Sequence, residues 1–335
     1  MNAVNYATEP TDRRSEYLSH SPAPGSAPHP GMIWIPGGRF AMGANDFYPE
    51  ERPAHTVQVS GFWMDATPVT NARFAEFIAA TGYKTMAEHA PDPSRYPGAR
   101  PELLVPGGLV FRKAKTRVNL DNPMQWWAYV PGADWRHPRG PNKGIAGRDK
   151  HPVVQVSFED AEAFARWAGK ELPTEAEWEF AARGGLDSAV FVWGNEDAPR
   201  GQPMANTWQG EFPWHNKRAG GYEGTSPVGA FPANGYGLYD MAGNAWEWTS
   251  DWYVPHHSQE HRKPCCTPMN PRVNSADESF DPNQPQIRIP RKVLKGGSHL
   301  CAPNYCFRYR PAARSPEAID TSTSHIGFRC VMRAT

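Results

Sequence analysis

Proline and glycine limit what this chain can fold into more than any other feature of the sequence. There are 35 prolines and 30 glycines among 335 residues. Proline removes a backbone donor and glycine costs extra backbone entropy, so neither favours long helices or strands. The chain also carries 13 Trp, 12 Tyr and 15 Phe, whereas disordered chains are poor in aromatic residues. We therefore expect a globular protein with much irregular backbone, held together by aromatic side chains.

Charge and hydropathy exclude several kinds of partner. Basic and acidic residues both number 35, so no basic excess argues for nucleic acid or an anionic membrane. No apolar run approaches the roughly 20 residues of a membrane-spanning helix. The first residues lack the apolar segment of a secretory signal peptide, and 5 cysteines are too few for a disulfide framework. We expect a cytoplasmic monomer in a reducing compartment.

The sequence predicts a polar tail followed by one domain. Residues 1–30 are rich in Ser, Pro and Ala, and we expect them to be disordered. Residues 31–335 then form a single domain, and a chain near 300 residues can bury a sizeable core. No regular internal repeat indicates a solenoid or a propeller.

Capping signals predict three helices within this domain. They begin after Thr70, Ser157 and Thr174 and end near Gly82, Gly169 and Gly184. An acidic residue at the third helical position, Asp160 in the second helix and Glu177 in the third, completes a capping box. Apolar residues recur along one face of each segment, so we interpret the helices as scaffold.

Short apolar runs predict strands near both ends of the domain. The predicted strands are 32–36 with 40–42 as a hairpin partner, 55–60, 293–295 and 328–332. Between the first two helices, residues 83–152 have loop character and contain Trp126, Trp127 and Trp135. Loops of this length within a compact domain are usually functional, so we expect this one to contribute to a site.

The densest group of reactive side chains is the segment GGSHLCAPNYCFRYR at residues 296–310. Cys301 and Cys306 are five positions apart, and neither a strand nor a helix brings such residues together. Pro303 and Asn304 between them predict a turn that does so. Three interpretations stay open: two inert buried thiols, a structural disulfide, or a two-thiolate site for a soft metal such as copper(I). Zinc requires four ligands, and only His299 offers a third.

A second cluster lies in the segment NGYGLYDMAGNAWEW at residues 234–248. Asp240 and Glu247, with carbonyls freed around Gly243, offer oxygen atoms of the kind that calcium binds. A turn followed by an aromatic core strand explains the same residues without a metal. On spacing alone, the second interpretation is favoured.

Arginines are concentrated after the second cysteine. Arg308, Arg310, Arg314 and Arg329 lie beside aromatic or small residues. Arginine in such surroundings usually stacks on rings and pairs with carboxylates, so a structural role is favoured over a substrate clamp. No P-loop, GxGxxG, GxSxG or HExxH pattern is present, and a general acid–base pair cannot be chosen from the linear sequence.

Five segments occur together and in a fixed order. They are MIWIPGGRFAMG (32–43), LPTEAEWEF (172–180), NGYGLYDMAGNAWEW (234–248), GGSHLCAPNYCFRYR (296–310) and GFRC (327–330). With these segments the chain resembles the formylglycine-generating enzymes, or sulfatase-modifying factors, over nearly all of residues 31–335. The middle segments mark a wider superfamily, whereas the two-cysteine segment is much more specific to true formylglycine generators.

The resemblance implies a fold and a reaction. The fold would be one mixed α+β domain with little regular secondary structure, distantly like C-type lectins. The reaction would oxidise the cysteine of a Cys-x-Pro-x-Arg segment in a sulfatase polypeptide to Cα-formylglycine, with dioxygen and a thiol reductant. Cys301 and Cys306 would be catalytic and would bind copper(I), and Ser298 would help to form the oxygen or substrate pocket.

The resemblance also implies further binding residues. Trp126 and Arg308 would contact substrate. One calcium ion would be bound by Asp240, Gly243, Ala245 and Glu247, and a second by Asn206, Thr207 and Tyr222. The acidic ligand of the second site is replaced here by Gly220.

Two other functions remain as alternatives. An iron-dependent sulfoxide synthase of the ergothioneine type would carry an N-terminal helical bundle with metal-binding histidines, and residues 1–30 are too few for one. A non-catalytic module that binds peptides or other ligands would not need both thiols. Ala165, Ala182 and Pro311 stand where vertebrate members carry disulfide cysteines, which supports a bacterial-type enzyme.

Overall fold

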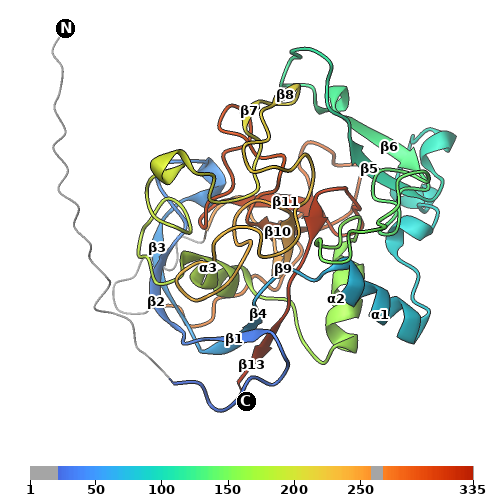
Figure 1. The fold of residues 1–335 in the computed structure, drawn as a ribbon. Coiled ribbons are helices and arrows are strands. Elements are labelled where there is room, and N and C mark those ends of the chain that lie inside the picture. Colours follow the sequence, from blue (N-terminus) through green and yellow to red (C-terminus); the bar gives the residue numbers. More distant parts are fainter. Residues whose placement is uncertain (1–21, 258–266, 335) are drawn as a thin grey trace, which may run out of the picture.

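The computed structural model describes residues 22–257 and 267–334 (Figure 1). Of the expected tail, residues 22–30 form bends and turns, and residues 1–21 lie outside the described residues. Cys265 and Cys266 also lie outside them. Within the described ranges, no helix is both long and apolar enough to cross a membrane.

The expected α+β fold with little regular secondary structure is confirmed. The helices are α1 (Asn71–Thr81), α2 (Phe158–Trp167) and α3 (Glu175–Arg183), with short 3-10 turns η1 (Pro49–Glu51), η2 (Met86–Glu88), η3 (Pro93–Arg95), η4 (Pro101–Leu103), η5 (Pro123–Gln125) and η6 (Pro199–Gly201). The strands are β1 (Met32–Ile35), β2 (Gly38–Met42), β3 (His55–Val59), β4 (Phe62–Asp65), β5 (Gly107–Phe111), β6 (Trp127–Pro131), β7 (Gly210–Glu211), β8 (His215–Asn216), β9 (Trp246–Trp252), β10 (Arg291–Lys295), β11 (Arg314–Ala318), β12 (Ile326–Gly327) and β13 (Val331–Arg333). The expected likeness to C-type lectins stays a prediction.

The first four strands form two bent antiparallel arms. β1 pairs with β4 and β2 pairs with β3 in one register, interrupted only where the chain passes from one sheet to the other. The predicted hairpin between 32–36 and 40–42 is therefore wrong, because the strand bends at Pro36 and Gly37 instead of reversing. A Cβ at Gly37 would meet backbone atoms of Gly61 and Val59 at 2.6 Å, so only glycine lets the two bends pack together.

The largest sheet carries the C-terminal half of the fold. Its strand order is β11-β10-β9-β12, with β12 parallel to β9 and the other neighbours antiparallel. β13 instead joins β4 at the edge of the β1-β4-β13 sheet, and the predicted strand at 328–332 is confirmed only in its last residues. The chain thus returns at its end to the N-terminal arms.

All three predicted helix starts are confirmed. The side chains of Thr70, Ser157 and Thr174 accept hydrogen bonds from main-chain N–H groups of the first turn, and the last two form capping boxes. α1 and α3 end at left-handed glycines, Gly82 and Gly184. α1 and α2 pack on each other, while α3 is buried along its whole length against β2, β3, β9 and β10 (Figure 1).

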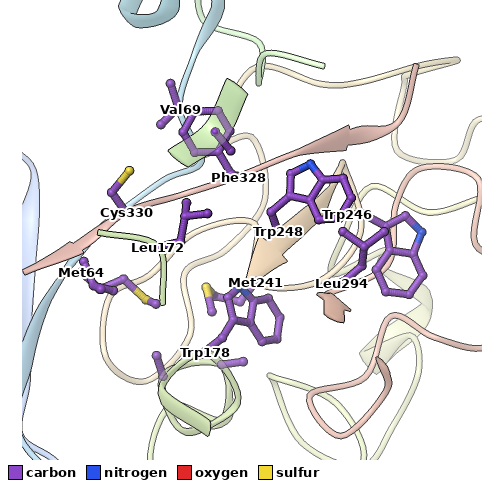
Figure 2. Close-up of a cluster of buried hydrophobic side chains, with 14 of the residues drawn as sticks. Met64, Val69, Leu172, Trp178, Met241, Trp246, Trp248, Leu294, Phe328 and Cys330 are labelled. Carbon is purple, nitrogen blue, oxygen red and sulfur yellow. The ribbon is translucent and has the colours of Figure 1, made fainter. Parts of the chain in front are cut away.

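Aromatic side chains fill the space between these elements. Figure 2 shows the indole rings of Trp178, Trp246 and Trp248 close to Met241 and Leu294 in the main core. Buried indole N–H groups need acceptors, and Trp178 donates to Glu247 at 2.7 Å. The expectation that large rings hold an irregular backbone together is confirmed.

Buried ion pairs tie the C-terminal segment to distant parts of the chain. Three arginines of the predicted cluster form them, Arg310 with Glu51, Arg314 with Glu175 and Arg329 with Glu247, with N–O distances of 2.5, 2.7 and 2.7 Å. Every one of these side chains is at most 4% exposed. The structural interpretation of these arginines is therefore confirmed.

Residues 83–152 are more ordered than the sequence predicts. They contain the antiparallel hairpin of β5 and β6 together with four 3-10 turns. A parallel bridge between Leu109 and Thr323 attaches β5 to the segment before β12. The hairpin escapes sequence reasoning because Gly107 and Gly108 in β5 and Pro131 in β6 are residues that strands usually avoid.

Loss of one buried arginine tests the importance of these ion pairs. Arg310→Met should lower the free energy of unfolding by about 3–5 kcal/mol, because it leaves Glu51 buried without a counter-charge. Urea denaturation measures this loss. Arg166→Met removes an exposed pair with Glu162 and should cost about 0.3–0.5 kcal/mol. An equal loss in both variants would contradict the argument.

Candidate active site

Two glycines allow the chain to turn into the site and to pack closely there. Gly296 and Gly297 follow β10 with φ of 90° and 70°, which side chains rarely adopt. A Cβ at Gly297 would meet backbone atoms of Arg308 and Tyr309 at 3.0 Å. The segment before the cysteines therefore lies directly against the segment after them.

A tight turn brings the two cysteines together. The main-chain N–H groups of Tyr305 and Cys306 both donate to the carbonyl of Ala302, at 3.1 and 2.8 Å. Pro303 lies within this turn, so the turn predicted between the cysteines is confirmed. The sulfur atoms of Cys301 and Cys306 approach to 3.0 Å, and both cysteines are free thiols.

The pKa values of the two thiols are shifted in opposite directions. Burial raises the pKa of the Cys301 thiol well above its usual value, and the contact with Cys306 raises it further. The pKa of the Cys306 thiol is lowered, first by the hydrogen bond from Cys301 and then by the Arg308 guanidinium, which outweigh burial. Cys306 is therefore the more acidic thiol of the pair and the one that more readily forms a thiolate. Thiolates, not thiols, act as nucleophiles and metal ligands.

Arg308 is held in place by residues of the connection between β2 and β3, which contains η1. Its guanidinium lies 2.6 Å from a carboxylate oxygen of Glu50 and 3.7 Å from the centre of the Tyr48 ring. The Tyr48 hydroxyl accepts a hydrogen bond from the main-chain N–H of Phe307 at 3.0 Å. Residues more than 250 positions away thus set the charge beside Cys306.

The cysteines line a cavity of about 230 Å³. Its other lining residues are Trp126, Trp127, Phe212, Trp246, Ser298, Leu300, Tyr305, Arg308, Ser315 and His325. All five residues predicted from sequence for catalysis and substrate binding, Cys301, Cys306, Ser298, Trp126 and Arg308, therefore lie around one space. Their predicted roles stay predictions.

Two polar groups in this wall are available to a bound molecule. The Trp126 indole is 1% exposed, and its N–H has no acceptor among the described residues. The Ser298 hydroxyl oxygen accepts from the main-chain N–H of Leu300 at 3.2 Å, which leaves its hydrogen free to donate. Buried unpaired donors are costly, so the unpaired Trp126 N–H needs an explanation such as a bound water or ligand.

A second, larger cavity of about 670 Å³ adjoins the first. Trp127 lines both cavities. The walls of the larger cavity come from 86–109, 124–129 and 320–322, so the long segment expected to be functional supplies most of them. Most of its lining is apolar, with Asp92, Arg95 and Asp320 among the charged groups.

The thiol pair fits copper(I). It offers two soft sulfur donors, one of them with a lowered pKa, inside a cavity with aromatic walls. Zinc fits less well, since no group of three or more His, Cys, Asp or Glu side chains within the described ranges can hold a metal ion. Copper binding itself stays a prediction.

The residues predicted for the first calcium ion already have partners. Both carboxylate oxygens of Glu247 accept from Arg329, and one also accepts from Trp178. Asp240 accepts from Gly229 and Asn244, and burial raises the pKa of its carboxyl. Calcium binds 6–8 oxygen ligands, whereas the carboxylates of Glu247 and Asp240 here accept hydrogen bonds from protein groups. Calcium binding at this site stays a prediction.

The second calcium site is also only a prediction. The Thr207 hydroxyl accepts from Gln209 at 2.7 Å, and the Asn206 amide donates to Gly224 at 2.9 Å. A Cβ at Gly220 would meet the Phe231 ring at 2.9 Å, so an acidic side chain at this position would require that ring to move. Tyr222 also lies beside Phe231, with ring centres 6.3 Å apart.

Sequence reasoning missed several residues of the site. Trp127, Phe212, Tyr305 and His325 line the cysteine cavity, and Glu50 positions Arg308. Tyr305 lies between the cysteines, which was a signal available in the sequence. The other residues come from separate segments, and no linear spacing relates them to the cysteines.

Comparison with known proteins shows the family. The family model for the sulfatase-modifying factor enzyme 1-like domain matches residues 19–334. The chain belongs to the formylglycine-generating enzyme family. It is 54% identical over 301 residues to the formylglycine-generating enzyme of Mycobacterium tuberculosis, covering 90% of this chain and 97% of that protein.

Other relatives include active and inactive members. The Mus musculus formylglycine-generating enzyme is 45% identical, covering 94% of this chain and 80% of its own length. The Mus musculus protein named inactive C-alpha-formylglycine-generating enzyme 2 is also 45% identical, covering 92% and 88%. Among solved structures, PvdO from Pseudomonas aeruginosa shares the fold, with a TM-score of 0.58, 22% identity and coverage of 90% and 94%.

Removing Arg308 tests how the thiolate is stabilised. In Arg308→Leu the pKa of Cys306 should rise, so alkylation of this thiol should require higher pH than in the native protein. Mass spectrometry of protein pulsed with iodoacetamide across a pH series measures the shift at Cys306. Arg166→Leu, on the exposed face of α2, serves as the control. An unchanged pH profile in Arg308→Leu would show that Cys301 alone sets this acidity.

Proposed function

We propose that this enzyme oxidises the cysteine of a Cys-x-Pro-x-Arg segment in a sulfatase polypeptide to Cα-formylglycine. Dioxygen is the oxidant, and a thiol reductant supplies the remaining two electrons. The substrate carbon loses its thiol as hydrogen sulfide and becomes an aldehyde, while the second oxygen atom leaves as water. Membership of the family supports the reaction class, and the thiol pair in its cavity supports the rest.

One observation carries the proposal. Two thiols whose pKa values are shifted in opposite directions lie 3.0 Å apart in the wall of a cavity. The Arg308 guanidinium beside Cys306 lowers the pKa of that thiol, which a purely structural cysteine would not need. Soft thiolate ligands favour copper(I) over hard cations. Copper(I) bound by Cys301 and Cys306 would supply the redox chemistry with dioxygen.

The residues of the chain have separate tasks in this proposal. Arg308 favours the thiolate form of Cys306, and Cys301 would be the second sulfur ligand of a bound copper(I) ion. Trp126 and Ser298 offer hydrogen-bond donors to what enters the cavity. Phe212 and Tyr305 stack at 4.5 Å and exclude water from one side of the cavity.

The two adjoining cavities support a polypeptide substrate. A single cysteine fills only the smaller cavity, whereas a peptide can place its cysteine there and its following residues in the larger one. The volume of about 670 Å³ lies within the range of ligand sites in proteins.

A cytoplasmic location and a monomeric state are proposed from the sequence alone.

Conversion of a peptide tests the reaction directly. A peptide containing Cys-x-Pro-x-Arg, incubated with copper-loaded protein, a thiol reductant and air, should show the mass loss of cysteine-to-aldehyde conversion. The metal-free protein should convert it at least about tenfold more slowly, since the bound metal would supply the redox step. Absence of conversion by the copper-loaded protein would contradict the proposed function.

Substitution of each thiol tests the site residues. Cys301→Ala and Cys306→Ala should each lower peptide conversion by more than about 100-fold and weaken copper(I) binding in a competition titration, because one thiolate cannot replace two. Cys330→Ala is the matched control, since this cysteine is free and buried but does not line the cavity. Full activity in either of the first two variants would reject their roles.

The inactive relative makes this second test important. Its identity to this chain equals that of the active Mus musculus enzyme, so identity over the whole chain does not report on the cysteine cavity. A chain that folds normally but binds no copper(I) through its thiols would instead fit the alternative of a peptide-binding module. The copper titration distinguishes the two functions without requiring the true substrate.

A further inference from the structure

One short segment connects the two cavities. Asp320, Thr321 and Ser322 line the larger cavity, and His325, three residues further on, lines the cysteine cavity. Trp127, which lines both, contacts the His325 ring at a centre-to-centre distance of 4.8 Å. Any chain that spans both cavities must therefore pass close to 320–325.

The His325 ring is fixed in position. Its Nδ1 atom lies 2.5 Å from the Thr323 hydroxyl oxygen, and its face lies against Trp127. Burial, followed by the neighbouring His299, lowers the pKa of His325 to about 3. The imidazole is therefore neutral at physiological pH, and one of its nitrogens carries a hydrogen.

The hydrogen bonds around Thr323 assign that hydrogen to Nε2. The Thr323 hydroxyl has one hydrogen to donate, and among the described residues its acceptor is Nδ1 of His325. Its oxygen is also approached by the main-chain N–H of His325 at 3.5 Å. The hydroxyl hydrogen finds an acceptor among the described residues only when Nδ1 is unprotonated, so we place the imidazole hydrogen on Nε2.

His325 lines the cysteine cavity, and its Nε2 atom has no hydrogen-bond partner within the described part of the chain. The Trp126 N–H, in the same wall, and the Ser322 hydroxyl, in the larger cavity, also lack partners within the described ranges. Unpaired polar groups thus follow the same path from one cavity to the other.

We infer that His325 is a substrate-binding residue whose Nε2–H donates a hydrogen bond to a main-chain carbonyl of the polypeptide beside its reacting cysteine. This inference rests on the proposed function and deepens it. A peptide presents one carbonyl per residue whatever its side chains are, and His325 lies in the wall of the cysteine cavity beside Trp127, which lines both cavities. Such a contact fixes where the cysteine stops relative to the thiol pair.

His325→Phe removes the N–H and keeps a ring to stack on Trp127. The KM for the peptide should rise about 5-fold, the range for one neutral hydrogen bond, with little change in kcat or in the KM for dioxygen. His325→Gln restores an N–H donor and should recover part of the loss. Thr323→Val removes the hydroxyl that fixes the tautomer and should give a smaller rise in the same KM.

A binding measurement separates this inference from the proposed function. A fluorescent peptide with serine in place of the reacting cysteine should bind about 5-fold more weakly to His325→Phe than to the native protein. This readout needs no turnover. If the native protein binds the serine peptide in a His325-dependent manner but converts no cysteine peptide, the proposed function fails and the inference stands.

Ester-substituted peptides identify the acceptor. An ester in place of the amide on either side of the cysteine weakens one carbonyl as an acceptor, and one of the two peptides should no longer distinguish native protein from His325→Phe. Unchanged peptide binding in His325→Phe would overturn the inference. A raised KM for dioxygen with an unchanged KM for the peptide would also overturn it, by showing that the N–H serves dioxygen.

Discussion

The pairing of buried arginines with glutamates holds this fold together and shapes its site. With so little helix and sheet, the segment after the cysteines has few backbone ladders to fix it. Arg308 and Arg310 instead pair with Glu50 and Glu51 in the N-terminal arm, and Arg314 pairs with Glu175 at the start of α3. Each pair is satisfied by several hydrogen bonds, which is what makes a buried charge tolerable.

The same arrangement makes the two thiols chemically different. Both belong to one turn and are of one residue type, yet Cys301 is enclosed while Cys306 also faces a guanidinium. The Arg308 side chain is directed by Glu50 and Tyr48, so the acidity of Cys306 depends on the N-terminal arm as much as on the cysteine segment. The arginine cluster therefore has both kinds of role. Arg310 and Arg314 form buried structural ion pairs, and Arg308 lowers the pKa of Cys306.

In the proposed function, a polypeptide substrate would occupy both cavities, with its cysteine beside the thiol pair. The cysteine cavity contains donors and aromatic walls, and the larger cavity has apolar walls contributed by residues of the long segment after α1. Their meeting point at Trp127 and His325 is where the main chain of a bound substrate would cross. Recognition of main-chain carbonyls there would let side-chain preferences arise in the larger cavity.

The sequence alone determined the local features whose causes are local. Thr70, Ser157 and Thr174 cap their helices because the capping groups lie within four residues, and the turn between Cys301 and Cys306 follows from the residues between them. The ordered motifs also identified the family, and five predicted residues proved to surround one cavity. Only the tertiary structure decided the pairing of β1 with β4, the position of Glu50 beside Arg308, and the place of His325 in the wall of the cysteine cavity. These contacts join segments far apart in the chain, and they depend on packing that no linear pattern records.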